Sequence, residues 1–330
     1  MRMRLFTGVF ATLTAATLML SCVSQQAQAA KLPGPLVDPA WLKANLAGVT
    51  VVDVRSWPRG FTLSPEYQAD KDGKKQLERP GGHIEGAKLL DYNLLRVDRN
   101  VQGKTIGKRV PEKAVFEKLM QDAGIPAGRP IVLTNPGDSF HEMDGAARVY
   151  WTLKYYGEDD VAILNGGNTA WLQAGYDVST DAAKSGAGDW QATAERRELI
   201  AEVDDVEAAM KQGAALVDAR SVEQYLGVSR KSSVQAAGHL KGARNFPIDV
   251  HTRSEGLAAL FMTPDEYGDV FRKLEIDAGP GSIAYCNTGH LAAGAWFVLS
   301  EILGVKNARL YDGSMLEWTT LGRPVVGLAD

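Results

Sequence analysis

The chain has 330 residues, of which 45% are hydrophobic, and its 36 Lys and Arg against 40 Asp and Glu give a formal net charge of −4. A mildly acidic chain without a basic run has no electrostatic footprint for nucleic acid, so no nucleic-acid partner is expected. The length is about twice the common domain size of roughly 100–150 residues and predicts two hydrophobic cores.

The first thirty residues predict an exported protein. Arg2 and Arg4 precede an apolar run from Leu5 to Leu20, and the polar stretch after it ends in Ala27-Gln28-Ala29-Ala30. A charged start, an apolar run shorter than a membrane span and a small-residue cleavage site are typical of a secretory signal peptide. We therefore expect residues 1–30 to be a cleaved signal peptide, no transmembrane segment in the mature chain, and a periplasmic location.

The chain has two cysteines, Cys22 and Cys286. Cys22 follows Met19-Leu20-Ser21, a poor match to a lipobox, so lipidation of Cys22 is the less favoured alternative to simple cleavage. Cleavage near residue 30 would change the charge to 34 − 40 = −6 and leave Cys286 as the only thiol. An unpaired cysteine in an exported protein is either reactive or a small buried apolar residue, and composition does not separate these two roles.

Three segments of the sequence occur twice in the same order, which predicts two homologous domains. Residues 48–56 return at 213–221, residues 82–87 at 238–243, and residues 165–171 at 312–318. We expect an N-terminal domain at 31–180, a C-terminal domain at 199–330 and, between them, a linker at 181–198 that is rich in small and polar residues.

Each copy alternates short apolar strands with helical stretches, a pattern typical of an α/β fold with a parallel sheet covered by helices on both faces. In the second copy, strands are expected at Ala214–Val217, Ser282–Tyr285 and Ala308–Tyr311. Helices are expected to begin at Asp38-Pro39 and at Thr263-Pro264, where a capping side chain precedes proline at the first helical position.

The segment around Cys286 is the strongest local signal for function. An apolar run ends at Tyr285 and an alanine-rich helix is expected from about Leu291, which puts Cys286 at the carboxyl end of a parallel strand. Ligands bind at this end of α/β sheets. Backbone N–H groups and the helix N-terminus there favour a thiolate or a persulfide anion. The expected backbone cradle consists of Asn287, Thr288, Gly289, His290 and Leu291.

The second copy carries five ordered motifs that resemble those of the rhodanese superfamily. They are Asp218-Ala219-Arg220, Tyr225-Leu226-Gly227, Gly238 to Ala243, Tyr285 to His290, and Tyr311-Asp312-Gly313. The resemblance covers residues 35–326 and is closest to the tandem thiosulfate and 3-mercaptopyruvate sulfurtransferases. It implies two rhodanese-like domains, of which the first lacks the nucleophile and the second carries the transferred sulfur on its cysteine. The equivalent turn of the first copy, residues 135–145, has no cysteine, and we expect that domain to form one wall of the cleft.

Two positions depart from the family pattern. Gln224 stands where tandem rhodaneses usually have an arginine that binds an anionic donor, and Leu291 stands where arginine is common. Thiosulfate and mercaptopyruvate are anions that require a cationic partner. A protonated His290, Arg230 or Lys231 could take over this role.

Other recurring residues are expected to support the structure. Asp218 and Arg220 are interpreted as a buried ion pair that braces the turn rather than as groups that react. Structural roles are also expected for His83, His239, Trp171 and Trp318, which recur in both copies. The histidines show no metal-ligand spacing and the glycines no nucleotide fingerprint, so we expect neither a metal nor a cofactor.

The sequence thus predicts a sulfurtransferase that moves sulfane sulfur from a donor such as thiosulfate or 3-mercaptopyruvate through a Cys286 persulfide. The acceptor would be cyanide or a thiol, including a thiol on a protein. The alternative is a non-catalytic rhodanese-fold binding or redox-sensing protein of the cell envelope. Phosphatases and arsenate reductases of related fold are disfavoured, because they need arginine six residues after the cysteine, where Ala292 stands.

Overall fold

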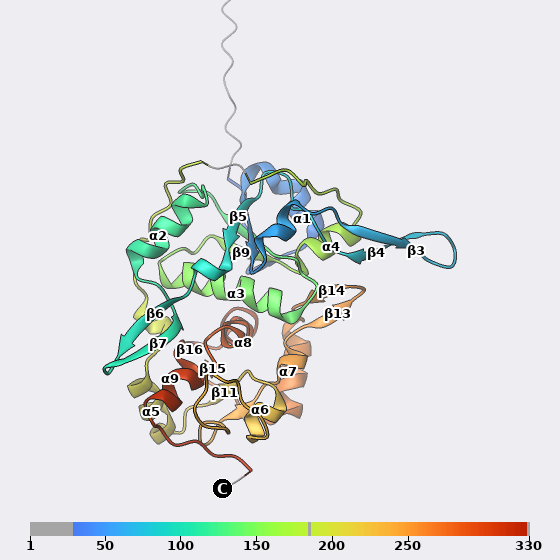
Figure 1. Ribbon diagram of the computed structural model, residues 1–330. Coiled ribbons are helices and arrows are strands. Elements are labelled where there is room, and N and C mark those ends of the chain that lie inside the picture. Colours follow the sequence, from blue (N-terminus) through green and yellow to red (C-terminus); the bar gives the residue numbers. More distant parts are fainter. Residues whose placement is uncertain (1–28, 184–185, 329–330) are drawn as a thin grey trace, which may run out of the picture.

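The computed structural model describes residues 29–183 and 186–328. Cys22 and all but the last two residues of the expected signal peptide lie outside these ranges. Within them, no helix is both long enough and apolar enough to cross a membrane. Figure 1 shows two α/β units, one above the other, that meet along helices near the middle of the molecule.

The first unit is built on a five-stranded parallel sheet. In sheet order its strands are β1 (Leu36–Val37), β9 (Val161–Leu164), β8 (Ile131–Thr134), β2 (Thr50–Arg55) and β5 (Lys88–Asp91). The helices of this unit are α1 (Pro39–Asn45), α2 (Lys113–Asp122), α3 (Phe140–Tyr155) and α4 (Gly167–Gln173). Strand β2 is buried along its whole length, as expected for a strand covered on both faces.

The second unit repeats this topology strand for strand, which confirms the predicted α/β duplication. Its parallel strands, in sheet order, are β10 (Ile200–Ala201), β16 (Arg309–Tyr311), β15 (Ile283–Tyr285), β11 (Leu216–Asp218) and β12 (Arg244–Asn245). Its helices are α5 (Val203–Gln212), α6 (Val222–Leu226), α7 (Pro264–Lys273), α8 (Leu291–Phe297), continued by a π-helical turn at Val298–Ile302, and α9 (Ser314–Thr320).

The predicted helix starts are confirmed, whereas the three strands expected in the second copy all begin later, β15 at Ile283 and β16 at Arg309 by one residue and β11 by two. Asp38 accepts a hydrogen bond from the Trp41 amide to cap α1, and Thr263 forms a capping box with Glu266 at the start of α7. Strand β11 begins at Leu216 rather than Ala214. The reason is that Gly213 ends α5 in a left-handed conformation and the Ala214 amide still bonds back to that helix.

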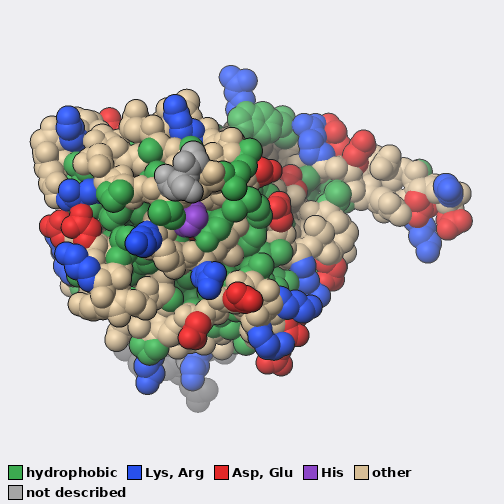
Figure 2. Space-filling view, turned by 90° about the horizontal axis from the view of Figure 1, so that it is seen from below, with side chains coloured by type: hydrophobic (Ala, Val, Ile, Leu, Met, Phe, Trp, Pro, Cys, Tyr) green, Lys and Arg blue, Asp and Glu red, His purple; other side chains and the backbone are tan. Residues whose placement is uncertain are grey.

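Three antiparallel hairpins extend from the sheets. They are β3 (Glu66–Ala69) with β4 (Lys75–Arg79), β6 (Val97–Val101) with β7 (Lys104–Arg109), and β13 (Arg253–Glu255) with β14 (Ala258–Leu260). The β3–β4 hairpin projects from the body, and Figure 2 shows charged side chains of both signs along it. Short 3₁₀ turns occur at Leu46–Gly48, Pro58–Thr62, Tyr92–Leu94, Arg197–Leu199 and Ile248–Val250.

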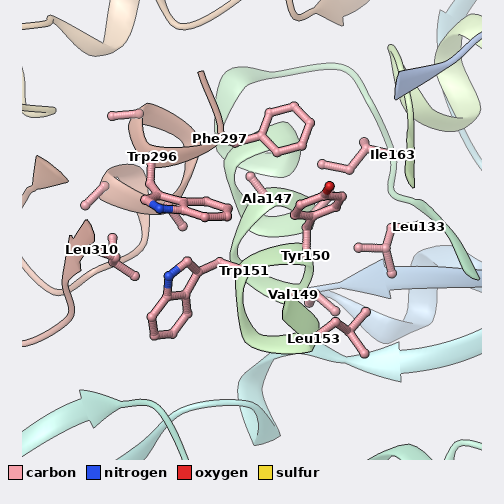
Figure 3. Packing of buried hydrophobic residues seen from close by; sticks show 14 of the residues in the cluster. Leu133, Ala147, Val149, Tyr150, Trp151, Leu153, Ile163, Trp296, Phe297 and Leu310 are labelled. Carbon is pink, nitrogen blue, oxygen red and sulfur yellow. The ribbon is translucent and has the colours of Figure 1, made fainter. Parts of the chain in front are cut away.

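Helices α3 and α8 cross closely between the two sheets and join the two cores. Gly294 of α8 lies so near Asp144 that a β-carbon there would be 1.7 Å from its carboxylate oxygen. Figure 3 shows Trp151 of α3 beside Trp296 and Leu310 of the second unit. Aromatic residues of both units therefore share one buried cluster, and we expect the units to unfold together.

The expected linker at 181–198 runs along the first unit for much of its length, with residues 184 and 185 outside the described ranges. Trp190 is buried and makes an edge-to-face contact with Phe116 of α2. The Thr193 and Arg196 amides donate to the Tyr156 and Tyr155 carbonyls at the end of α3. These contacts tie residues 188–196 to the first unit, so little of this segment is a free spacer.

A buried ion network centred on Asp312 connects the two units. Asp312 follows β16 and accepts hydrogen bonds from the Arg109 Nε, at 2.9 Å, and from the Val110 amide, at 2.7 Å. Arg148 of α3 forms an ion pair with the other carboxylate oxygen. Burial opposes ionisation of Asp312, but the two guanidiniums outweigh it and hold its pKa below the usual value.

Arg109 also pairs with Glu202 and with the buried Glu317 of α9. Burial, reinforced by the neighbouring Glu202 and Asp312 carboxylates, raises the pKa of Glu317 to about 7 although Arg109 opposes this shift. Asp312 is therefore the carboxylate that holds the guanidiniums of the first unit most firmly.

Replacing Asp312 with asparagine should destabilise the protein strongly, because Arg109 and Arg148 would lose the buried carboxylate that they share and Arg148 would keep no ion-pair partner among the described residues. We expect Asp312→Asn to lower the free energy of unfolding by about 3 kcal/mol, measured by urea denaturation. Glu66→Gln is the control, because it removes the half-exposed ion pair with Arg79 and should cost less than about 1 kcal/mol. Equal unfolding midpoints for the two variants would contradict the central role of Asp312.

Candidate active site

Cys286 lies directly after β15, in the loop that leads into α8, as the sequence predicted. Its side chain is only 1% exposed. The Thr288 amide points at the sulfur, with 3.4 Å between the nitrogen and Sγ. One amide of the expected cradle therefore contacts the sulfur, while the Gly289 amide turns to the Ser314 hydroxyl at 3.2 Å.

Ser314 holds the cysteine loop from the neighbouring strand end. Its hydroxyl accepts hydrogen bonds from the Cys286 and Gly289 amides and donates to the Tyr311 carbonyl at 2.8 Å. Ser314 adopts a left-handed conformation, with φ of 51°. Sequence reasoning did not select Ser314, although it directly follows the repeated Asp312-Gly313 motif. That position after β16, next to β15 in the sheet, was the available signal.

Gly289 is required by the close approach of the first unit. It has φ of 75°, and a β-carbon there would lie 2.7 Å from both Arg148 Nη1 and the Asp312 carbonyl oxygen. Arg148 donates a hydrogen bond to the Gly289 carbonyl at 3.0 Å. The same arginine thus binds the loop and Asp312, so the ion network between the units also fixes the cysteine loop.

Gln224 and Arg230 are committed to local contacts. The Asn287 side-chain amide donates to the Gln224 side-chain oxygen at 2.7 Å, so the Gln224 side chain is bound to the cysteine loop. Arg230 donates to the Val234 carbonyl of its own loop at 2.6 Å and does not line the pocket described below. Leu291 is buried in the hydrophobic core and also lies outside that pocket.

Asp218 and Arg220 form the expected buried ion pair. The Arg220 Nη2 lies 2.6 Å from the Asp218 carboxylate and 2.8 Å from the Gly238 carbonyl oxygen. In the first unit, Arg55 makes the same contacts with Asp53 and the Gly82 carbonyl. The pair therefore braces one turn in each unit, with or without a cysteine nearby.

The other recurrent residues have the structural roles that the sequence predicted. His83 and His239 each hydrogen-bond a backbone carbonyl and stack on an aromatic ring. Trp171 and Trp318 are both buried. Across residues 29–183 and 186–328, no group of three His, Cys, Asp or Glu side chains is arranged to hold a metal ion.

His290, at the start of α8, contacts Tyr92 of the first unit. The Tyr92 hydroxyl and His290 Nδ1 are 2.5 Å apart. Burial, together with the charges of Arg96 and Arg148 and the neighbouring His141, holds the pKa of His290 well below its usual value. Burial also raises the pKa of Tyr92 to about 12. His290 is therefore neutral near pH 7 and does not supply the positive charge considered for it.

A pocket of about 290 Å³ opens between the two units beside the cysteine loop. It is lined by Val54, Ser56, Tyr92, Asn93, Arg96, Lys108, His141, Glu142, Gly145, Lys231, Thr288 and His290. Thr288 and His290, which follow Cys286 in its loop, belong to this lining, whereas the buried Cys286 does not. As predicted, the unit without a cysteine forms one wall, using the start of α3 and residues near the β6–β7 hairpin.

The chain belongs to the rhodanese family. The model of the rhodanese-like domain matches twice, at residues 38–174 and 202–321, in agreement with the two sheets. These matches confirm that both units are rhodanese-like domains.

The relatives and structures that resemble the chain support sulfurtransferase as its general class. A Haloferax volcanii protein named "Putative thiosulfate sulfurtransferase" is 33% identical over 64% of this chain and 74% of its own length. The sulfur carrier protein TtuD of Thermus thermophilus is 29% identical over 82% of this chain and 94% of its own. The structure of SseA from Escherichia coli, described as a 3-mercaptopyruvate sulfotransferase, aligns with a TM-score of 0.66 and 24% identity, covering 85% of this chain and 98% of SseA. At that identity the structural match shows the fold.

Removing the Ser314 hydroxyl should loosen the cysteine loop. Ser314→Gly accommodates the left-handed backbone but leaves the buried Cys286 and Gly289 amides without an acceptor, at a cost of about 2–4 kcal/mol. Urea unfolding and the rate of Cys286 alkylation measure the effect. Asn307→Gly is the matched control, because Asn307 is exposed, also left-handed at φ of 57°, and should tolerate glycine without loss. A Ser314→Gly variant as stable as this control would show that the hydroxyl is dispensable.

The lowered pKa of His290 predicts the pH dependence of Cys286 chemistry. A histidine whose pKa lies below its usual 6.5 gains its proton only in more acid solution, so it stays neutral from pH 6.5 upward. The alkylation rate of Cys286 should therefore show the same pH profile between pH 6.5 and 8.5 in the wild type and in His290→Gln. A step near pH 6.5 that disappears in the variant would contradict this.

Proposed function

We propose that this protein transfers sulfane sulfur through a persulfide on Cys286. The observation that carries the proposal is the position of this thiol at a strand-to-helix loop, with the Thr288 amide on its sulfur and a pocket beside it. A backbone N–H aimed at sulfur stabilises negative charge there, both on the thiolate and on the persulfide.

The proposed reaction has two balanced steps. The Cys286 thiolate attacks the outer sulfur of thiosulfate, a new S–S bond forms, and the S–S bond of thiosulfate breaks to release sulfite with its electron pair. A nucleophilic acceptor, either cyanide or another thiol, then takes the outer sulfur and restores the thiolate. The names of the relatives favour thiosulfate as the donor, and 3-mercaptopyruvate is the second candidate.

Burial of Cys286 supports a role in carrying sulfur. A persulfide that is shielded from bulk solvent is protected from unselective reaction with thiols in solution. An acceptor would approach it through the pocket beside the loop. The proposed site of action is the periplasm, on the basis of residues 1–30 alone.

The second candidate is a non-catalytic binding or redox-sensing protein of the cell envelope. It is favoured by Gln224, which binds the loop at the position where the family usually has arginine. A protein of this kind would keep the fold and the pocket without turning over a sulfur donor.

Intact-mass measurement distinguishes these two functions. The mature protein should gain the mass of about one sulfur after incubation with thiosulfate or 3-mercaptopyruvate, because a persulfide adds one sulfur to the thiol. Cyanide should remove this gain, and Cys286→Ser should never show it. If neither these donors nor polysulfide adds sulfur to the wild type, sulfur transfer is excluded and the second candidate remains.

A further inference from the structure

Three cations line the pocket beside the cysteine loop. Arg96 lies just before β6, Lys108 lies in β7, and Lys231 follows α6 in the second unit. Arg96 donates to the Thr288 carbonyl at 3.3 Å and stacks over Tyr92. In the described part of the chain, no carboxylate forms an ion pair with any of the three.

The three charges are close enough to repel one another. Burial lowers the pKa of Lys108, and the positive charges of Arg96 and Lys231 lower it further. Neighbouring cations without a counter-charge favour the binding of an anion, which relieves their repulsion.

Glu142 is the acidic residue of the pocket lining, so it offsets at most one of these three charges. Burial and the nearby Asp138 raise the pKa of the Glu142 carboxyl, which reduces its tendency to ionise. Burial lowers the pKa of His141, and His290 is neutral for the reason given above. The pocket therefore carries a net positive charge near neutral pH.

The backbone of the β6–β7 hairpin gives a second, independent indication. The strand register shifts between Val97 and Arg99, and Lys108 on the opposite strand has φ of 64°. This left-handed conformation suits glycine or asparagine better than lysine, and bulges of this kind re-aim side chains near active sites. Strain retained at a lysine that lines a pocket points to a function of its side chain.

We propose that Arg96, Lys108 and Lys231 bind the oxyanion group of the sulfur donor, in place of the arginines that the family usually has at the positions of Gln224 and Leu291. This inference rests on the proposed sulfur transfer. Such a cation site would favour compact donors in which the transferable sulfur is attached to an oxyanion group, as in thiosulfate, over uncharged donors. The same cations would stabilise sulfite as it leaves, because its negative charge stays in their field.

The first test uses two alkylating reagents of nearly equal size at Cys286. Iodoacetate carries a carboxylate and iodoacetamide is neutral, and both form the same S–C bond with loss of iodide. The double variant Lys108→Gln/Lys231→Gln should lower the iodoacetate-to-iodoacetamide rate ratio about tenfold. Added salt should lower the ratio of the wild type more than that of the variant. Lys104→Gln, an exposed lysine of the same hairpin outside the pocket, is the matched control and should keep the wild-type ratio.

The second test is persulfide formation with increasing thiosulfate, followed by intact mass. The double variant should need about ten times more thiosulfate for half-maximal loading than Lys104→Gln does. An unchanged rate ratio, or equal slowing of both reagents, would overturn the inference while leaving sulfur transfer intact if thiosulfate still loads Cys286. A changed ratio without loading by thiosulfate, 3-mercaptopyruvate or polysulfide would support the cation site but remove the proposed function. A wild-type Cys286 that neither reagent nor any of these three donors modifies would overturn both.

Discussion

The structure depends on one buried carboxylate, that of Asp312. It stands at the carboxyl end of a strand in the second unit and receives two arginines, Arg109 and Arg148, from the first unit. Asp312 is the carboxylate that both guanidiniums share, and it is the one that pairs with Arg148 in the described part of the chain, whereas Arg109 also pairs with Glu202 and Glu317. Because Arg148 also holds the Gly289 carbonyl, the ion network that joins the units also fixes the loop of Cys286.

This arrangement gives the cysteine-free unit a defined part in the site. It cannot carry a persulfide, since its own loop has no thiol. It supplies Arg148, which binds the Gly289 carbonyl of the cysteine loop, and it supplies Tyr92 and Arg96, which contact His290 and Thr288. The duplication thus yields two copies with different roles. Both copies keep the Asp–Arg pair that braces the turn after the second strand of each unit, and only the second copy has a cysteine in the loop that follows β15.

Local rules in the sequence were sufficient for much of the fold. The caps at Asp38 and Thr263 fixed where helices begin, and the repeated motifs fixed two equivalent parallel sheets. Cys286 was located correctly because strand, cysteine and helix are consecutive in the chain. Strand β11 was misplaced by two residues, because the end of α5 took the Ala214 amide into its own hydrogen bonding.

The sequence by itself determined the family, the duplication and the position of Cys286 in a strand-to-helix loop, since each depends on neighbours along the chain. Only the tertiary structure decided which charges surround that residue. Arg96, Lys108 and Arg148 lie between 138 and 190 residues before Cys286, and no spacing rule links them to it. Arg96 and Arg148 contact the loop, and Lys108 lines the pocket beside it, because the two units pack against each other. The burial created by that crossing also keeps His290 neutral, which its position in the sequence does not reveal.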